Sequence, residues 1–332
     1  MFAAGELGGM SNVSRRAVLG AGIAIAAAPR PALSTPGDEV VELWPGTPPG
    51  ATGVPIVRKI DDQSHDPSNP DRWIRGIDRP TLVVRRPAKP NGAAVLLIPG
   101  GSYWFEAYDN EGTSQADWLN ARGITAFILL YRLPHEGWQH REDVPLQDAQ
   151  RAMRLIRSRA RQFGILPDRV AVLGFSAGGH LAGSLAARHA ESVYARVDEA
   201  DRLSARPDIA GLIYPVVSLD ASFTHAGSRD ALLGPDATEA ARRARSVELR
   251  VTEDMPPTFL VHAADDQVVP PANSIALFGA MQAKARPVAL HIFDRGGHGF
   301  GVHPPASEPV SAWPGLFAAF GARHGVFPQS LG

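Results

Sequence analysis

A serine between small residues is the first candidate for chemistry in this chain. Residues 171–180 read Ala-Val-Leu-Gly-Phe-Ser-Ala-Gly-Gly-His, which places Ser176 between Gly174 and Gly178. At a sharp turn from strand to helix, a serine is held in a strained conformation that lifts its hydroxyl above the sheet, and glycines leave room for the crossing chain. The apolar run before Ser176 and the helical spacing after it predict this context. The pattern therefore indicates a nucleophile, the alternative being a Gly/Ser-rich turn that matches by chance.

Two later loops carry the partners that a nucleophilic serine needs. Asp265 and Asp266 follow the apolar run 257–262, and His298 lies among glycines after the run 288–293. A triad acid orients an imidazole and stabilises its charged form, while the imidazole moves protons as general base and then as general acid. We expect Asp266 to be the acid and His298 the base, with Asp265 as the alternative acid or as a brace for its own loop.

The remaining histidines carry less weight. His180 lies one turn into the helix after the serine and is expected to be packed behind the site, and His262 to hydrogen-bond the backbone. His303 is a weaker alternative for the base.

A glycine pair after the run 93–98 is the candidate oxyanion hole. Pro99-Gly100-Gly101-Ser102-Tyr103 follows that run, and glycines let backbone N–H groups approach a developing negative charge. We expect the donors to be Gly101 and Ala177, the residue after the nucleophile, with Gly100 or Ser102 as auxiliaries. A tight turn alone explains Gly-Gly equally well.

These loops converge only if the runs that precede them are neighbouring parallel strands, because ligands bind beyond the carboxyl ends of such strands. Apolar or alternating runs predict strands, and 93–98 has the continuous apolar character of a buried central strand. Expected strands are 40–44, 56–60, 81–86, 93–98, 125–131, 169–173, 209–215, 257–262 and 288–293, of which 81–86 reads as an edge strand.

Helical patterns alternate with these strands. The range 145–163 carries an apolar stripe, with Arg151, Arg154, Arg157 and Arg161 expected on a solvated outer face. Further helices are expected near 273–284 and 313–324. Strand-helix alternation predicts the α/β class, with a mostly parallel sheet and helices on both faces. The range 220–252 is the least regular interior segment and is expected to form a minimal cap or pocket wall, with a short helix near 238–245.

Composition narrows the classes of partner and cofactor. The formal net charge is −1, so no global field favours nucleic acid. Cysteine is absent, which excludes disulfides, thiolate metal sites and a cysteine nucleophile. No histidine or carboxylate cluster has convincing metal-ligand spacing, and there is no glycine-rich nucleotide loop. We therefore expect a small-molecule or carbohydrate substrate, no cofactor and no metal.

The N-terminal residues have the features of a targeting signal. Ser14-Arg15-Arg16 precedes the weakly apolar run 17–28, and small residues near Ala32 permit cleavage. The run is too short to span a bilayer, so stable membrane insertion is not expected. This leader, residues 1–34, resembles a bacterial twin-arginine export signal, which implies a periplasmic or secreted protein; a disordered basic tail in a cytoplasmic protein is the alternative. Residues 35–332 are expected to form a single catalytic domain.

Four motifs together resemble the α/β-hydrolase superfamily. They are Ile-Pro-Gly-Gly-Ser-Tyr at 98–103, Gly-Phe-Ser-Ala-Gly-Gly-His at 174–180, His-Ala-Ala-Asp-Asp-Gln-Val-Val-Pro at 262–270 and Gly-Gly-His-Gly-Phe-Gly at 296–301. Their chain order of serine, aspartate and histidine is that of the superfamily. The resemblance covers roughly residues 40–325. Within the superfamily, the chain is similar to bacterial acetyl-xylan-esterase-like and feruloyl-esterase-like proteins.

The resemblance implies Ser176 as nucleophile, Asp266 as acid, His298 as base and the Gly101 and Ala177 amides as oxyanion hole. It also implies hydrolysis of carboxylic esters with small acyl groups, on acylated carbohydrate of the xylan type. One departure concerns the oxyanion loop, because lipases carry a His-Gly-Gly-Gly run where this chain has Pro99-Gly100-Gly101-Ser102.

Aromatic residues after that loop are candidates for a substrate-binding face. Tyr103 is the first choice, beside Trp104, Phe105 and Tyr108, although packing against the sheet explains them equally well. Two other functions stay open: a peptidase of the prolyl-oligopeptidase type, which shares this core, and a catalytically inactive hydrolase fold used for binding.

Overall fold

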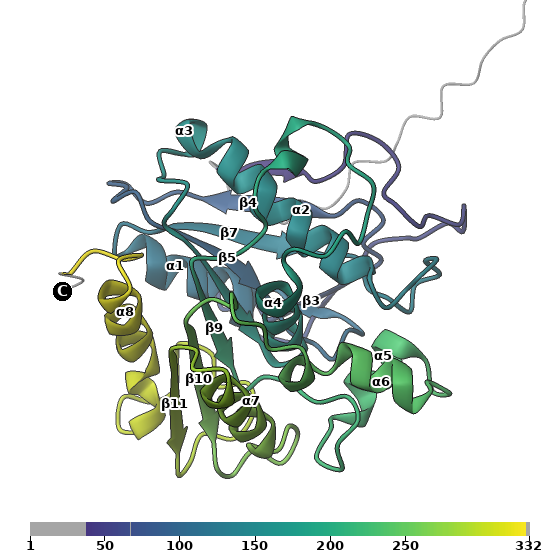
Figure 1. Ribbon diagram of the computed structural model, residues 1–332. Coiled ribbons are helices and arrows are strands. Elements are labelled where there is room, and N and C mark those ends of the chain that lie inside the picture. The colour runs from purple at the N-terminus through teal and green to yellow at the C-terminus, as the bar shows by residue number, and fades with distance from the viewer. Residues whose placement is uncertain (1–37, 67, 330–332) are drawn as a thin grey trace, which may run out of the picture.

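Eight strands form one twisted sheet that runs through the middle of the molecule (Figure 1). The computed structural model describes residues 38–66 and 68–329. The strand order is β1-β4-β7-β5-β8-β9-β10-β11, in which β1–β4 and β4–β7 pair antiparallel and all other neighbours pair parallel. The strands are β1 (Glu39–Glu42), β4 (Thr81–Arg85), β5 (Ala94–Ile98), β7 (Thr125–Leu130), β8 (Val170–Phe175), β9 (Ile209–Ile213), β10 (Thr258–Ala263) and β11 (Val288–Phe293). The predicted mostly parallel sheet is confirmed.

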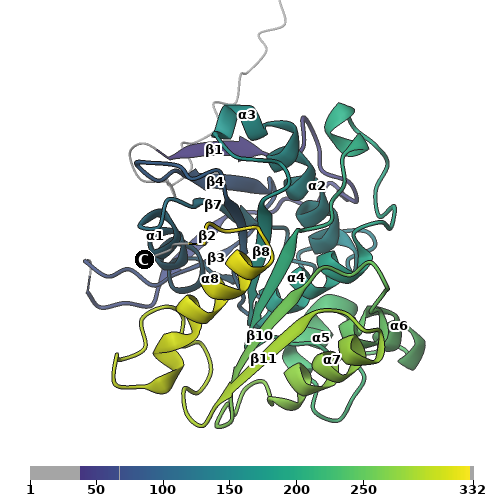
Figure 2. The same cartoon turned by 60° about the vertical axis from the view of Figure 1, so that its left-hand side comes forward.

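Helices cover both faces of this sheet, as predicted. Figure 2 shows α1 and α8 on one face and α4 and α7 on the other. The helices of the two layers include α1 (Ser114–Asn120), α2 (Val144–Ser158), α4 (Ser176–Arg188), α7 (Ala272–Ala283) and α8 (Trp313–Arg323). With both faces covered, all five residues of β5 and all six of β8 are buried, which is why these strands read as continuous apolar runs.

The strand predicted at 81–86 is present as β4, but the prediction that it lies at the edge of the sheet is wrong. Four of the five residues of β4 are buried, because β1 pairs along its outer side. The antiparallel strand β1, which is only four residues long, forms the edge instead.

The predicted helix 145–163 is two helices, α2 and α3 (Ala160–Phe163), which are separated at Arg159. Gly164 ends α3 in the left-handed conformation, with a φ of 69°, as its C-terminal position suggests. The expectation that Arg151 faces solvent is wrong. Its guanidinium is buried and pairs with Asp198 at 2.7 Å and Asp201 at 3.0 Å.

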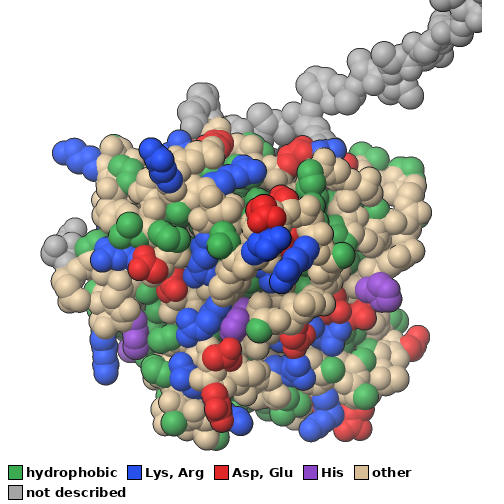
Figure 3. Space-filling model, turned by 45° about the horizontal axis from the view of Figure 1, so that its top comes forward, with side chains coloured by type: hydrophobic (Ala, Val, Ile, Leu, Met, Phe, Trp, Pro, Cys, Tyr) green, Lys and Arg blue, Asp and Glu red, His purple; other side chains and the backbone are tan. Residues whose placement is uncertain are grey.

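Charges of both signs are interspersed on the surface. Figure 3 shows basic and acidic side chains side by side on the face it presents. Arg157, for example, pairs with Asp208 at 3.1 Å. This mixture fits a solvated helix face and not a basic patch.

A second, three-stranded antiparallel sheet lies outside the main one and was not predicted as a sheet. It consists of β2 (Lys59–Asp62), β3 (Arg72–Arg75) and β6 (Glu106–Ala107). The strand expected at 56–60 begins and ends later, as β2. Because β6 follows the glycine pair after only the four residues 102–105, this small sheet borders the loop after β5.

The irregular interior segment forms a small cap, as predicted. It contains α5 (Ala226–Leu233), α6 (Glu239–Arg245) and a 3₁₀ turn (Val247–Leu249), which project beside the carboxyl end of the sheet (Figure 1). Further 3₁₀ turns are Glu199–Arg202 and Pro309–Ala312. No helix in the described part of the chain is long and apolar enough to cross a bilayer. The proposed leader, residues 1–34, lies outside the described residues, and the division at residue 35 stays a prediction.

Candidate active site

Ser176 is held at a strained turn between β8 and α4. Its φ is 52°, a left-handed value that non-glycine residues rarely adopt. A Cβ on Gly174 would meet the carbonyl of Gly178, and one on Gly178 would meet the carbonyl of Ile98. Both glycines are therefore required by the close approach of strand and helix, and together they fix the direction of the serine side chain.

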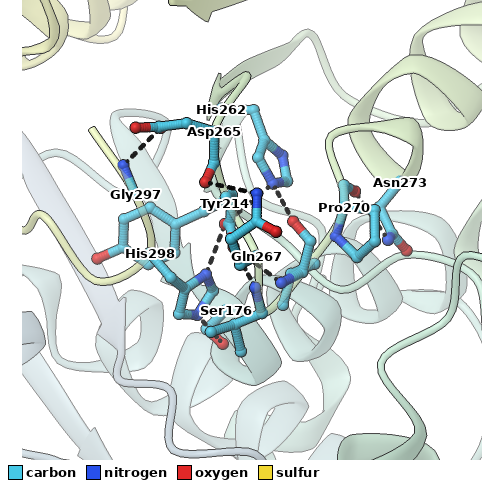
Figure 4. Close-up of polar contacts among 12 residues, drawn as sticks. Ser176, Tyr214, His262, Asp265, Gln267, Pro270, Asn273, Gly297 and His298 are labelled. Atoms are coloured by element: carbon cyan, nitrogen blue, oxygen red, sulfur yellow. Dashed lines mark hydrogen bonds and ion pairs between the residues drawn. The ribbon is translucent and has the colours of Figure 1, made fainter. Parts of the chain in front are cut away.

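His298 and Asp266 meet Ser176 at the carboxyl end of the sheet, and Figure 4 shows the imidazole of His298 beside Ser176. Nε2 of His298 lies 2.9 Å from Oγ of Ser176, and Nδ1 of His298 lies 2.7 Å from Oδ2 of Asp266. The three residues come from the ends of β8, β10 and β11. The serine and aspartate are buried, whereas the histidine side chain is 17% exposed. This is the geometry of a nucleophile, a base and an orienting acid.

Asp266 is held as an anion by its neighbours. Its Oδ1 accepts hydrogen bonds from the N–H groups of Val268 and Val269, both at 2.9 Å. Burial by itself raises the pKa of Asp266, but the contacts with His262 and His298 outweigh it and hold this pKa well below its usual range. A carboxylate that stays ionised can orient the imidazole without taking its proton.

The neighbouring residues take the supporting positions that were expected of them. Asp265 is exposed and its Oδ1 accepts a hydrogen bond from the N–H of Gly297 at 2.8 Å (Figure 4), so it braces the His298 loop. His262 is buried and its Nε2 donates to the carbonyl of Val269 at 2.8 Å. His303 is exposed, and the imidazole that contacts Ser176 is that of His298.

The oxyanion loop after β5 brings Gly101 to the same pocket as Ser176. Gly101 has a φ of 118°, and a Cβ there would meet the carbonyl of Phe105. Among the described residues none accepts a hydrogen bond from the Gly101 N–H, and Ala177 lies in the first turn of α4, where N–H groups have no partner within the helix. Both amides are therefore available to an oxyanion.

Gly100 is not the auxiliary oxyanion donor that was expected. Its N–H donates to Oε2 of Glu111 at 2.6 Å, so it is not available to a substrate. Ser102, the other expected auxiliary, has a φ of 56° and lines the pocket.

Tyr103 does not lie on a substrate-binding face. Its side chain is 1% exposed, and its hydroxyl lies 2.8 Å from Nδ1 of His180. The other ring nitrogen of His180 lies 2.9 Å from the carbonyl of Arg245. Burial lowers the pKa of His180 to about 4, so this histidine is a neutral bridge between the oxyanion loop and the cap. The positive φ of Tyr103, 62°, turns its ring inward, which the sequence did not indicate.

The pocket beside Ser176 has a volume of about 240 Å³. Its wall includes Trp73 from β3 and Phe105, whose rings stack with centroids 3.9 Å apart. Of the aromatic candidates, Phe105 thus reaches the pocket, while Tyr103 and Tyr108 are buried elsewhere.

The sequence reasoning missed several pocket residues, among them Trp73, Asn110 and Glu111. Trp73 was missed because it lies in a segment of the sequence without a helical or strand periodicity. Asn110 and Glu111 were missed because acidic and amide side chains in irregular segments are usually solvated. The only available signal was the closeness of Asn110 and Glu111 to the glycine pair. Among the residues that the structure describes, no group of histidines and carboxylates is arranged to hold a metal ion.

Comparisons with known proteins agree with this geometry. Residues 83–281 match the BD-FAE family. An acetylxylan esterase from Xylanibacter ruminicola is 32% identical over 227 residues, which cover 66% of this chain and 43% of that protein. Endo-1,4-beta-xylanase B from Butyrivibrio fibrisolvens is 36% identical over 221 residues, covering 67% of this chain and 34% of that protein. The chain thus spans less than half the length of these two relatives.

Solved structures share this fold over most of the chain. The crystal structure of an acetyl ester-xyloside bifunctional hydrolase from Caldicellulosiruptor lactoaceticus has a TM-score of 0.71 and 34% identity, and covers 87% of this chain and 97% of its own. The carboxylesterase Cest-2923 from Lactobacillus plantarum has a TM-score of 0.64 at 22% identity, covering 82% of this chain and 100% of its own. The chain therefore belongs to the BD-FAE family and has the α/β-hydrolase fold.

Proposed function

We propose that this protein is a serine esterase that removes small acyl groups, and that its substrates are acetylated carbohydrates of the xylan type. The observation that carries the proposal is the continuous contact from Ser176 through His298 to Asp266, at 2.9 and 2.7 Å. Similarity to the acetylxylan esterase and to the acetyl ester-xyloside bifunctional hydrolase supports the substrate class.

The reaction follows from the geometry. Oγ of Ser176 attacks the ester carbonyl while Nε2 of His298 takes its proton, and the N–H groups of Gly101 and Ala177 receive the negative charge on the carbonyl oxygen. Collapse of this intermediate breaks the ester bond, and the alcohol leaves with the proton from His298. Water then gives a proton to His298 and attacks the acyl-serine, which releases the carboxylic acid and restores the hydroxyl of Ser176.

The size of the pocket supports a small acyl group. Its volume of about 240 Å³ lies below the range of about 300–1,000 Å³ that holds drug-sized ligands. The stacked rings of Trp73 and Phe105 close one side of it.

Hydrolysis of 4-nitrophenyl acetate tests the activity. We expect Ser176→Ala and His298→Ala to lose turnover while folding normally. Ser184→Ala is the matched control, since Ser184 is a buried serine of the same helix, and it should keep wild-type turnover. Turnover that survives Ser176→Ala unchanged would defeat the proposal. A purified wild type that cleaves peptide 4-nitroanilides but no ester would favour a peptidase, and one that turns over neither would favour a binding protein.

A substrate panel tests the class of ester. It consists of acetylated xylan, feruloylated arabinoxylan fragments and 4-nitrophenyl esters of increasing acyl length. Acetate release from xylan, with falling kcat/KM as the acyl chain lengthens, is expected. A preference for long acyl chains would contradict the carbohydrate-esterase function.

We also propose that residues 1–34 direct export, so that the enzyme acts in the periplasm or outside the cell. This rests on the sequence of the leader, Ser14-Arg15-Arg16 before a short apolar run. Fusion of residues 10–40 to a reporter tests it, with Arg15 and Arg16 both changed to lysine as the control. A reporter that stays in the cytoplasm with both arginines intact would refute export.

A further inference from the structure

A single turn of π-helix lies between the two loops that carry the oxyanion hole and the base. This π-turn, Asp109–Thr113, comes between β6 and α1, and the N–H of Thr113 donates to the carbonyl of Tyr108 five residues earlier, at 3.0 Å. Such turns are rare and are often found at functional sites. Asp109 anchors the π-turn to β3 through a two-pronged ion pair with Arg72, at 2.7 and 2.8 Å.

The π-turn binds the oxyanion loop through Glu111. Its side chain is 4% exposed, and Oε2 accepts the hydrogen bond from the N–H of Gly100 at 2.6 Å. A Cβ on Gly100 would lie 2.8 Å from this oxygen and 2.9 Å from Cβ of Ser176. The carboxylate is therefore packed beside the nucleophile and fixes the peptide that precedes the Gly101 donor.

The other carboxylate oxygen reaches the His298 loop through Tyr214. The hydroxyl of Tyr214 donates to Oε1 of Glu111 at 2.9 Å, and the same hydroxyl lies 3.4 Å from the N–H of Gly301. The tyrosine ring lies 4.8 Å from the ring of His298, between centroids. Tyr214 itself follows β9 with a φ of 38°, so its position is fixed by the sheet.

Asn110 adds a second link from the π-turn to the His298 loop. Its Nδ2 donates to the carbonyl of Gly299 at 2.9 Å. Two consecutive residues of the π-turn thus contact both the oxyanion loop, through Gly100, and the His298 loop, through Gly299.

We propose that Glu111 is a positioning residue, which sets the distance between the oxyanion donor on Gly101 and the imidazole of His298 through its bonds to Gly100 and Tyr214. The proposal rests on the esterase function proposed above. Glu111 does not act on the substrate itself, since both of its oxygens are occupied by hydrogen bonds within the protein. Burial raises the pKa of Glu111, whereas the hydrogen bonds from the Gly100 N–H and the Tyr214 hydroxyl oppose this rise. The two hydrogen bonds thus partly offset the cost of burying the carboxylate of Glu111.

Three variants separate positioning from general damage. Glu111→Ala removes both acceptors and should lower kcat for 4-nitrophenyl acetate by about 10²-fold, the size of effect expected when catalytic groups shift by about 1 Å. KM should change little, because Glu111 is almost completely buried and the Trp73 and Phe105 side of the pocket stays in place. Glu111→Gln keeps an acceptor for Gly100 and a group that can bond the Tyr214 hydroxyl, so it should recover most of the lost rate. Tyr214→Phe should lower kcat about tenfold, as expected for the loss of one hydrogen bond to a charged group.

A transition-state analogue supplies a readout that a purely structural role would not change. Phenylboronic acid forms a tetrahedral adduct with a reactive serine, and its binding depends on the oxyanion hole. Its inhibition constant should rise in step with the fall in kcat across the three variants. Glu136→Gln is the matched control, since Glu136 accepts amide hydrogen bonds from Gly76 and Ile77, and it should match the wild type in every assay.

The outcomes distinguish this inference from the proposed function. A wild type without esterase activity would remove both. An active wild type, together with a folded Glu111→Ala variant whose kcat and boronic acid affinity are unchanged, would overturn the positioning role alone. Glu111→Gln as slow as Glu111→Ala would also overturn it, because the hydrogen bonds would then not be the cause. If Glu111→Ala does not fold, Tyr214→Phe decides, and an unchanged kcat in that variant refutes the proposal.

Discussion

Asp266→Asn is the most direct test of how the carboxylate orients His298. Oδ1 of Asp266 accepts two backbone N–H groups, from Val268 and Val269, and Oδ2 faces Nδ1 of His298. In the variant, the amide oxygen must take the Oδ1 position, because an NH₂ group cannot accept from those backbone donors. The NH₂ group then faces Nδ1 of His298 and makes that nitrogen an acceptor.

The proton of the imidazole consequently moves to Nε2, which lies 2.9 Å from Oγ of Ser176. An Nε2–H donates to the serine and cannot take its proton, so general-base catalysis is lost. The same substitution in serine-protease triads lowers kcat by about 10⁴-fold, which corresponds to about 5.5 kcal/mol of transition-state stabilisation. We expect a loss of this size here.

The assay is the kcat for 4-nitrophenyl acetate at neutral pH, with Asp265→Asn as the matched control. The side chain of Asp265 accepts a hydrogen bond from the N–H of Gly297, and asparagine keeps an oxygen for it. That variant should stay within about threefold of the wild type, as exposed substitutions usually do. If Asp266→Asn stays within tenfold of the wild type, or if Asp265→Asn is the slower of the two, the assignment of the acid is wrong.

Three further predictions concern the pocket and the stability of the fold. Gly100→Ala places a Cβ 2.6 Å from the carbonyl of Phe175 and 2.9 Å from Cβ of Ser176, so this variant should lower kcat by at least about tenfold. Gly279→Ala is the control, because Gly279 lies on an exposed part of α7 and a Cβ there would have no atom within 4 Å. The control should keep the wild-type kcat and raise the free energy of unfolding in urea by up to about 1 kcal/mol. Trp73→Ala removes one pocket wall and should raise kcat/KM for butyrate esters relative to acetate; an unchanged ratio would mean that Trp73 does not limit the acyl group. The pKa of His180 is about 4 in the folded protein and about 6.5 in the unfolded chain, so the unfolded state binds more protons between these values and stability falls as the pH falls through this window. Between about pH 7 and pH 5 the wild type should lose about 2 kcal/mol more of its unfolding free energy than His180→Asn, and parallel urea curves for the two proteins would refute this.

Several features of the fold were predictable because their causes are local. The runs that became β5 and β8 are buried on both faces, so every position had to be apolar and the pattern was visible in the sequence. The break between α2 and α3 at Arg159 and the position of β4 inside the sheet could not be recognised in the sequence. The pairing of β1 along β4 depends on a partner about 40 residues away in sequence, which no local pattern encodes.

Burial of polar side chains was also beyond local reasoning. Arg151 lies at a position of α2 that reads as part of its outer face, yet its guanidinium pairs with Asp198 and Asp201. A charged side chain can be buried when such partners are present, and these partners come from a segment that packs there only in the folded chain. Tyr103 was misplaced for a related reason, since its hydroxyl finds His180 inside the protein.

The sequence by itself determined the elbow at Ser176 and the choice of Asp266 and His298 to accompany it. Each of these residues lies in the turn or loop that follows a strand, and parallel strands bring their carboxyl ends to one edge of the sheet, so the spacing in the chain was enough. Only the tertiary structure decided what holds these residues in place. Glu111 joins Gly100 to Tyr214, and Trp73 comes to the pocket from a separate sheet. Such contacts depend on where irregular segments pack, and packing is a property of the whole folded chain.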